Sequence, residues 1–379
     1  MSRFSDSDLK WMQTALALAR RGEGLTRPNP PVGAVVVKNN RILGQGWHRQ
    51  AGGPHAEIHA LRQAGPRAKG ATLYVTLEPC STHGRTPPCV DAILQAGIRR
   101  VVVAAIDPNP SHAGRGIRLL RRHGVDVETG IGAEEAARLI APFACLMRNR
   151  RPWFTLKLGL SLDGRIADHT HSSRWITGPE ARKTVQALRR VSDAILIGAG
   201  TLRHDNPSLW PRPDRGRSPW RVIVVRTGAL PLSAQVFTDA HASRTIVAAP
   251  RGWVPAAAQA LRRKGITVWE LPARRFLPAL ATQLCELGVL RVLCEGGGIL
   301  AGELIRARLA DELCVFLAPM LLGGPVGAMG NTQWRLAQAP RFHLVESLPA
   351  GHDIFLRFEP AEPAGRAEPS RPGKPRKTQ

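Results

Sequence analysis

Residue types that bind zinc lie close to one carboxylate in the first quarter of the chain. His55, Cys80 and Cys89 provide one imidazole and two thiols, and Glu57 follows two positions after His55. Hydrolytic zinc centres use three protein ligands and leave the fourth position for a water molecule. A carboxylate beside the metal can take a proton from that water and pass it to a departing amine. These residues predict a base-deaminase centre with zinc on His55, Cys80 and Cys89 and with Glu57 as the proton shuttle.

The spacing of the two cysteines differs from the usual pattern of such deaminases. Their signature ends in Pro-Cys-x-x-Cys, whereas the eight residues 81–88 separate Cys80 from Cys89. The longer loop predicts a different substrate pocket. A closed structural zinc site and buried cysteines without metal are the other interpretations, but neither gives a purpose to an open ligand position beside Glu57.

Two of the expected ligands coincide with predicted helix starts. Residues 55–64 follow a helical pattern, and Pro88 begins a second helical run. A helix N-terminus carries partial positive charge and unpaired amide hydrogens, which favour a thiolate over a thiol. We therefore expect His55 and Cys89 to lie at helix N-termini.

Length and composition indicate two domains and no membrane span. The 379 residues suffice for two ordinary domains. The chain has no apolar run long enough to cross a membrane, and its first residues do not resemble a signal peptide, so we expect a cytoplasmic protein. Six cysteines are too few and too unevenly spaced for a disulfide framework, so we expect reduced thiols.

The net charge of +24 indicates either anionic partners or a drift of the composition towards arginine. A nucleic acid would be one such partner, but the arginines are dispersed, and the chain has one tyrosine and nine phenylalanines for stacking on bases. We therefore favour compositional drift together with phosphorylated small-molecule partners over nucleic acid.

Hydrophobic patterning divides the chain into two α/β units and a tail. In the first unit a helix over residues 8–21 precedes a layered sheet with the order β-β-α-β-α-β-α-β. A helix over 134–147 and a basic turn at 148–152 separate it from a second alternation of strands and helices. We place the domains at residues 1–147 and 148–360, followed by a basic, disordered tail at 361–379. Strands are expected at 32–38, 41–48, 71–77, 99–106 and near 125, and then at 153–160, 194–197, 221–225, 245–249, 266–271, 291–294 and 313–318.

Several motifs together resemble the bifunctional riboflavin-biosynthesis deaminase-reductase family. The first half contains Pro-Asn-Pro-Pro-Val-Gly at 28–33, His-Ala-Glu at 55–57, Thr-Leu-Glu-Pro-Cys at 76–80 and Gly-Arg-Thr-Pro-Pro-Cys at 84–89. The second half contains Leu-Lys-Leu-Gly-Leu-Ser-Leu-Asp-Gly-Arg-Ile-Ala at 156–167, Ser-Arg-Trp-Ile-Thr at 173–177, Asp-Asn-Pro at 205–207 and Glu-Gly-Gly at 295–297. The resemblance extends over about residues 8–358.

The resemblance implies an α/β protein with a cytidine-deaminase-like three-layer α/β/α domain followed by a dihydrofolate-reductase-like α/β domain. The first domain would bind one Zn²⁺ and remove ammonia from a phosphoribosylated diaminopyrimidinone. The second would use NADPH to reduce the ribosyl side chain to ribityl. A homodimer formed through the reductase domain is also implied.

The resemblance further assigns residues to ligands. The pyrimidine nucleotide would contact Asn29, His48, Arg85, Asp107 and Asn109 in the deaminase domain. NADPH would contact Gly159, Trp175, Thr201, Asp205, Gly297, Gly298, Ile299, Leu300, Ala301, Gly302 and Glu303. The substrate of the reductase would contact Ser173, Leu209, Arg212 and Glu295.

Of these assignments, the glycine turn also has a basis in the residues themselves, whereas Trp175 does not. The glycines after Glu295 follow a strand and precede a helix, so their bare amides suit a cofactor phosphate, although most such clusters are only tight turns. Considered alone, Trp175 is expected in the core. The chain departs from the family pattern at Thr82, where a histidine is usual, and at Val225, where an aspartate is common. Beside Val225, Arg226 is available to meet a phosphate.

The sequence thus predicts a bifunctional enzyme, a zinc hydrolase joined to an NADPH-dependent oxidoreductase. One alternative is a deaminase of tRNA or DNA bases with a basic second domain, against which the eight-residue spacing of the cysteines counts. The other is a zinc-stabilised scaffold with one or both halves inactive, which the departures at Thr82 and Val225 would favour.

Overall fold

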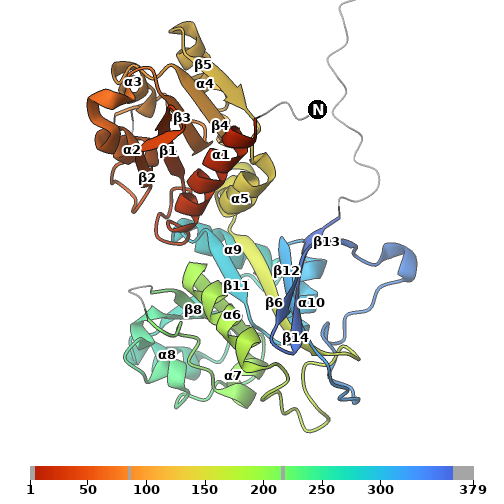
Figure 1. The fold of residues 1–379 in the computed structure, drawn as a ribbon. Coiled ribbons are helices and arrows are strands. Elements are labelled where there is room, and N and C mark those ends of the chain that lie inside the picture. Colours follow the sequence, from red (N-terminus) through yellow and green to blue (C-terminus); the bar gives the residue numbers. More distant parts are fainter. Residues whose placement is uncertain (1–4, 84–86, 215–217, 362–379) are drawn as a thin grey trace, which may run out of the picture.

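The structure, a computed structural model, describes residues 5–83, 87–214 and 218–361. Its first unit is built on a five-stranded sheet with the order β2-β1-β3-β4-β5 (Figure 1). The strands β1 and β2 form an antiparallel hairpin, and β3, β4 and β5 are parallel to one another. The elements of this unit are α1 (Asp6–Arg20), β1 (Gly33–Lys38), β2 (Arg41–Trp47), α2 (Ala56–Ala64), β3 (Thr72–Leu77), α3 (Cys89–Gln95), β4 (Arg100–Ala105), α4 (Arg115–Arg122), β5 (Asp126–Thr129) and α5 (Ala133–Asn149).

Helices cover both faces of this sheet because its central strands are apolar on both sides. Alternate residues of β1, such as Val36 and Val35, enter two different cores. One core contains α2, α3 and α4, and the other contains α1 and α5. The unit therefore has three layers, with the sheet between two layers of helices (Figure 1).

The second unit is built on a nine-stranded sheet with the order β10-β9-β8-β7-β11-β6-β12-β14-β13. Its strands from β10 to β12 are parallel, and a C-terminal hairpin adds β14 and β13 in antiparallel fashion. The elements are β6 (Trp153–Ser161), α6 (Pro179–Val191), β7 (Ala194–Gly198), α7 (Ala199–Asp205), β8 (Trp220–Val224), β9 (Thr245–Pro250), α8 (Pro255–Arg263), β10 (Thr267–Leu271), α9 (Phe276–Glu286), β11 (Arg291–Cys294), α10 (Gly298–Arg306), β12 (Glu312–Ala318), β13 (Phe342–Ala350) and β14 (Asp353–Pro360).

Two apolar cores also enclose the second sheet. Helices α9 and α10 pack on one face, and α6, α7 and α8 pack on the other. Three loops leave the carboxyl ends of neighbouring strands β6, β7 and β11 at the same edge of the sheet. In open α/β sheets this edge is where ligands bind.

The predicted elements are confirmed in type, and most bounds shift by one or two residues. Helix α5 runs to Asn149, so the expected basic turn begins only at Arg150, which lies in the left-handed conformation. Helix α10 begins at Gly298, two residues before Leu300, where the hydrophobic pattern of the sequence predicts its start. The domain limits at 147 and 360 stay predictions, and the tail lies beyond the described residues apart from Ala361.

Two parts of the second unit were not predicted. Helix α7 has seven residues and follows β7 without a loop, which is too short for a helical period to be recognised. The hairpin of β13 and β14 lies at the edge of the sheet, and most side chains of β13 are exposed or half-buried. The polar-apolar alternation that indicates a strand is therefore weak in this segment.

None of the helices in the described ranges is both long and apolar enough to cross a lipid bilayer. The six cysteines are free thiols, as expected for a chain without a disulfide framework. The cytoplasmic location stays a prediction.

Candidate functional site

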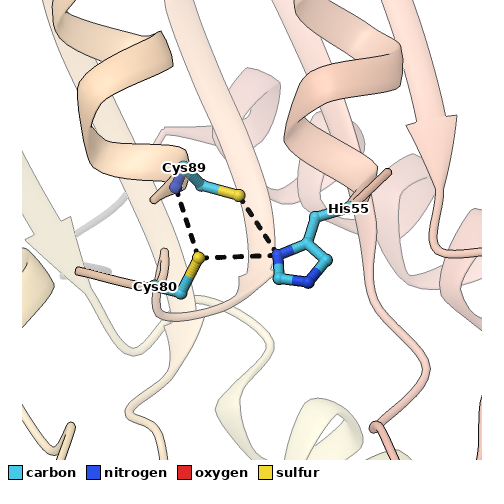
Figure 2. A group of neighbouring side chains, drawn as sticks. All are labelled: His55, Cys80 and Cys89. Atoms are coloured by element: carbon cyan, nitrogen blue, oxygen red, sulfur yellow. Dashed lines mark hydrogen bonds between the residues drawn. The ribbon is translucent and has the colours of Figure 1, made fainter. Parts of the chain in front are cut away.

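The three predicted zinc ligands converge from three separate segments. His55 is the N-cap of α2, Cys80 follows the end of β3 by three residues, and Cys89 is the first residue of α3. The Nδ1 atom of His55 lies 3.3 Å from Cys89 Sγ and 3.5 Å from Cys80 Sγ. Figure 2 shows both sulfur atoms turned towards this nitrogen. The predicted ligands thus meet at one point through Nδ1 of the imidazole.

The spacing of these atoms fits a tetrahedral zinc ion. With ordinary Zn–N and Zn–S bond lengths, such a nitrogen and sulfur lie about 3.6 Å apart. The two observed separations of 3.3 and 3.5 Å are close to this value. Among the described residues, His55, Cys80 and Cys89 are the group of possible ligands whose atoms all lie within 4.8 Å of one another.

The surroundings of Cys80 favour its thiolate form. The side chain and the backbone N–H of Cys89 both approach its sulfur, the latter with an N–S distance of 3.2 Å. The hydrogen bond from the Cys89 side chain is the largest cause that lowers the pKa of Cys80, to about 4. Zinc binds cysteine as the thiolate, so this environment favours the metal-binding form.

Glu57 lies in the first turn of α2 and is only 3% exposed. Its burial raises the pKa of its carboxyl group, an effect that the nearby His55 opposes. A buried carboxyl with a raised pKa can hold a proton at a pH where an exposed one would release it. The structure places Glu57 beside the ligands, where the sequence predicted the proton shuttle.

One side of this site consists of His48, which directly follows β2, and Asn29, which lies in the loop before β1. His48 is buried, and its ring meets the ring of His55 edge-on at a centroid distance of 5.2 Å. Its Nδ1 lies 3.1 Å from the carbonyl oxygen of Pro54, which can only accept, so Nδ1 carries the proton. Its Nε2 therefore accepts from Asn29 Nδ2 at 3.1 Å. Burial lowers the pKa of His48, which keeps this ring neutral.

The loop after β4 contains Asp107 and Asn109. The side chain of Asp107 accepts from the Asn109 backbone at 2.8 Å, and that of Asn109 accepts from the Ser111 backbone at 3.0 Å. Burial raises the pKa of Asp107. Arg85, the remaining predicted contact of the pyrimidine nucleotide, lies outside the described residues.

In the second unit, the glycine turn after β11 forms the start of α10. Gly297 is the N-cap of this helix, and its N–H donates to Thr201 Oγ1 of α7 at 3.0 Å. Of the predicted stretch 297–303, Ile299 is 66% exposed, while Leu300, Ala301 and Gly302 are buried. These buried residues can contribute to a cofactor site only through their backbone.

Trp175 is 66% exposed, so the expectation of a core residue is wrong. The guanidinium group of Arg182 lies 4.4 Å from the centre of its ring, and Arg174 also approaches that ring. Ser173 donates to Asp205 Oδ1 at 3.1 Å, so two further predicted residues touch. An exposed indole beside the guanidinium group of Arg182 in α6 gives a flat surface on which a ring can stack.

Glu295 and Glu57 are both buried glutamates, but their surroundings shift the pKa of the carboxyl group in opposite directions. Burial alone would raise the pKa of Glu295, but the positive charge and hydrogen bonds of Arg189, together with Lys157, lower it overall. Arg189 donates to both carboxylate oxygens, at 2.6 and 3.0 Å, and Lys157 Nζ lies 3.8 Å away. Glu295 is therefore fixed as an anion, whereas the environment of Glu57 favours a proton.

The remaining residues predicted to contact ligands in the reductase half are Gly159, Leu209 and Arg212, which come from two separate segments of the chain. Gly159 lies within β6, beside Thr177. The side chain of Leu209 is in the core at φ +60°, so only its backbone is available to a ligand. Arg212 is exposed, and its backbone N–H donates to Gln186 at 2.8 Å.

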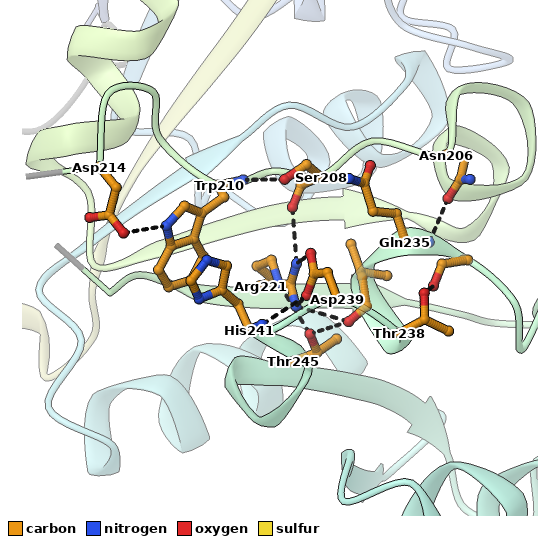
Figure 3. Close-up of polar contacts among 12 residues, drawn as sticks. Asn206, Ser208, Trp210, Asp214, Arg221, Gln235, Thr238, Asp239, His241 and Thr245 are labelled. Atoms are coloured by element: carbon orange, nitrogen blue, oxygen red, sulfur yellow. Dashed lines mark hydrogen bonds and ion pairs between the residues drawn. The ribbon is translucent and has the colours of Figure 1, made fainter. Parts of the chain in front are cut away.

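A buried arginine fixes the loop that carries Leu209 and Arg212. Arg221 of β8 is completely buried and donates to the Ser208 carbonyl and to both oxygens of Asp239 (Figure 3). It also donates to Thr245 Oγ1 and the Val236 carbonyl. Trp210 stacks on His241 in the same network, with ring centroids 3.6 Å apart. The position of the loop therefore depends on a fully hydrogen-bonded guanidinium.

Comparison with known proteins identifies both units. Residues 5–105 match the cytidine and deoxycytidylate deaminase zinc-binding region, and residues 152–356 match the RibD C-terminal domain. The chain is 43% identical to riboflavin biosynthesis protein RibD of Bacillus amyloliquefaciens, over 93% of this chain and 96% of that protein. It is 41% identical to the Escherichia coli protein of the same name, over 93% and 99% of the two chains.

The chain belongs to the RibD family. A solved structure of Acinetobacter baumannii RibD superimposes with a TM-score of 0.83 at 40% identity, covering 94% of this chain and 99% of that one. A deaminase/reductase from Thermotoga maritima gives a TM-score of 0.82 at 34% identity. The predicted family, the two-domain α/β fold and the bifunctional role in riboflavin biosynthesis are confirmed, and the first unit is a zinc-binding deaminase domain.

The two residues that depart from the family pattern, Thr82 and Val225, lie in different surroundings. The Thr82 hydroxyl lies 3.3 Å from Nδ1 of His112, which belongs to the loop after β4. Val225 is completely buried and packs among the apolar side chains of the core. Arg226 is exposed, and its guanidinium lies 4.9 Å from the ring centre of Phe276, while its predicted contact with a phosphate stays a prediction.

Four residues near these sites were missed by sequence reasoning. Lys157, Arg182, Arg189 and Arg221 gain their partners only in the folded chain. In a sequence with 53 lysines and arginines, no local signal separates these from solvated surface charges. Of these four, only Lys157 lies inside a family motif, and this motif was the one signal in the sequence that could have indicated a role for it.

We predict that Cys89→Ser loses bound zinc. Removing a direct ligand should reduce zinc affinity by more than the roughly 10–100-fold that follows loss of an outer hydrogen-bond partner. Zinc content after dialysis, measured by inductively coupled plasma mass spectrometry, should fall from one per chain to a small fraction. Cys145→Ser, which removes a buried thiol of α5, is the control and should keep its zinc. Full zinc occupancy in Cys89→Ser would contradict the assignment.

Proposed function

We propose that the chain deaminates a phosphoribosylated diaminopyrimidinone and then reduces its ribosyl side chain with NADPH. The observation that carries the proposal is the convergence of His55, Cys80 and Cys89 beside the buried Glu57, in a chain that belongs to the RibD family. The A. baumannii and T. maritima proteins have the same two-unit arrangement over nearly their whole length.

In the deaminase half, His55 Nδ1 and the sulfur atoms of Cys80 and Cys89 would hold zinc. The metal, when bound, supplies an acidified water molecule for attack on the amino-bearing ring carbon. Glu57 takes the proton from the attacking water and delivers it to the departing amino group, so that ammonia leaves. The raised pKa of Glu57 supports this exchange because the protonated carboxyl is not strongly disfavoured.

Neutral polar groups in the deaminase half would orient the pyrimidine. His48 is neutral and donates through Nδ1 to Pro54, which fixes its ring as the acceptor of the Asn29 amide. Asp107 and Asn109, in the loop after β4, are proposed to contact the ribose phosphate or the ring, together with Arg85. Amides and fixed rings of this kind discriminate a heterocycle by its pattern of donors and acceptors.

In the reductase half, NADPH would bind across the edge formed by β6, α7 and the start of α10. Bound NADPH supplies the hydride, so no protein nucleophile is required. The amides at the N-terminus of α10 suit the cofactor phosphates, and Thr201 fixes the Gly297 amide there. Gly159, Trp175, Asp205 and the stretch 297–303 complete the proposed cofactor site.

The substrate of the reductase would lie between this cofactor site and a pair of cations. Glu295 is ionised between Arg189 and Lys157, so it can accept a hydrogen bond from a ribose hydroxyl. Ser173, Arg212 and the backbone of Leu209 are proposed contacts on the other side. Holding the ribosyl carbon against the nicotinamide is the main contribution expected from these residues.

We further propose a homodimer formed through the reductase domain. The proposal rests on the family resemblance, and it is supported by an edge strand, β13, that carries the exposed apolar residues Leu344 and Leu348.

The first test of the two activities is incubation with the diaminopyrimidinone nucleotide, with and without NADPH, followed by mass spectrometry of the products. We predict that Glu57→Gln keeps one zinc per chain but slows ammonia release about a hundredfold or more. Its reduction of the already deaminated nucleotide should be unchanged, which is an internal control for folding. Glu134→Gln, an exposed carboxylate of α5, should behave as the wild type in both assays. Normal deamination by Glu57→Gln would refute the proton-shuttle role, and no product from the wild type would favour an inactive scaffold.

For the cofactor site we predict that Thr201→Val weakens NADPH binding about fivefold to tenfold, because the Gly297 amide loses its acceptor. The dissociation constant is measured by quenching of NADPH fluorescence, without substrate. Thr184→Val, on the exposed side of α6, is the matched control. Equal affinities of Thr201→Val and the wild type would contradict the placement of NADPH at this turn.

For the proposed homodimer, sedimentation velocity should give the mass of two chains at micromolar concentration. Leu344→Lys places a charge on the exposed face of β13 and should shift the protein towards the mass of one chain. A wild-type chain that sediments as a monomer would refute the proposal.

A further inference from the structure

Glu78 is a buried carboxylate that neither half-reaction uses. It follows the last residue of β3 and precedes the zinc ligand Cys80 by two positions, and it is 5% exposed. A buried ionisable group is costly unless hydrogen bonds compensate for its lost hydration. The partners of Glu78 therefore indicate what it does.

Four backbone N–H groups donate to this single carboxylate. Oε2 accepts from Asp107 at 3.2 Å and from Gly114 at 2.8 Å. Oε1 accepts from Gly116 at 2.9 Å and from Ile117 at 3.4 Å. Asp107 and Gly114 are the two ends of the loop that follows β4, and Gly116 and Ile117 belong to the first turn of α4. One side chain thus closes the whole loop and caps the helix that follows it.

Two other contacts join the same loop to the zinc-ligand segment. A side-chain carbon at Gly116 would lie 2.1 Å from the carbonyl oxygen of Pro79, so α4 packs against this segment at a distance that only glycine permits. Within the loop, His112 Nδ1 lies 3.3 Å from the Thr82 hydroxyl. The loop and the start of α4 are therefore attached on both sides of Cys80 in the sequence.

We propose that Glu78 is a positioning residue of the deaminase centre. It holds the loop of residues 107–114 over the zinc-ligand segment and thereby sets how tightly the pyrimidine nucleotide binds. This inference rests on the proposed deaminase function, in which Asp107 and Asn109 contact the substrate. It assigns the effect of Glu78 to substrate binding and leaves the proton transfer to Glu57.

Glu78→Gln tests the role because the two side chains have the same shape. Oε1 and Oε2 each accept two N–H groups, so either orientation of the amide turns its NH₂ towards one of these pairs. Either the two ends of the loop or the first turn of α4 then lose their acceptor. We expect KM for deamination to rise about tenfold or more, while kcat changes less than about threefold. Hydrogen exchange of the amides of residues 107–117 should become faster.

The same preparation contains its own controls. Zinc should remain at one per chain, and reduction of the deaminated nucleotide should proceed at the wild-type rate. Glu134→Gln changes the charge of the same domain equally and should leave KM unchanged. A purely structural role would instead lower zinc content and apparent kcat together at constant KM, and that result would overturn the proposal. An unchanged KM with full zinc would overturn it as well.

Thr82→Val keeps the test decisive if Glu78→Gln does not fold. Among the contacts of the described residues it removes the one with His112, so KM should rise by a smaller factor, about twofold to fivefold, at constant kcat. Should Glu78→Gln be insoluble and Thr82→Val have the wild-type KM, the proposal is wrong. If the wild type itself releases no ammonia, the proposed function fails instead, so the two failures are distinguishable.

Discussion

The meeting of one nitrogen and two sulfur atoms is the constraint around which the deaminase domain is arranged. His55, Cys80 and Cys89 come from three segments. Their ligand atoms lie close together because α2 and α3 both begin beside the carboxyl end of β3. The same arrangement gives Cys80 a backbone N–H donor and places it near two positive helix ends. The apolar sheet below keeps these helix starts in register, so the domain core and the metal site depend on the same packing.

Buried charges divide into those that serve the scaffold and those that serve chemistry. Glu78 accepts four backbone N–H groups, and the Arg221 guanidinium donates to five acceptor atoms, so both side chains are held in place by complete hydrogen bonding. Glu295 is similarly fixed by Arg189. At Glu57 burial dominates instead, and its pKa rises. A carboxyl left without enough compensation is suited to exchange a proton, whereas a fully compensated one is suited to hold a position.

Sequence reasoning predicted the zinc ligands and Glu57 because their chemistry is specific to residue type and spacing. It also predicted most strands and helices, since apolar periodicity follows from burial of one or two faces. The β13–β14 hairpin and α7 were missed because an exposed edge strand and a seven-residue helix carry little periodicity. Trp175, expected in the core when considered alone, is exposed, and we propose that it presents its flat ring to the cofactor.

The sequence by itself determined the metal, the reaction class, the family and the order of the two domains, because each is encoded in local motifs. Only the tertiary structure decided that Nδ1 of His55 faces the sulfurs, that His48 is neutral, and that Glu78 closes the loop after β4. These features depend on atoms from distant segments that come within hydrogen-bond distance. No local pattern records such contacts, since they arise when the helices pack on the sheet.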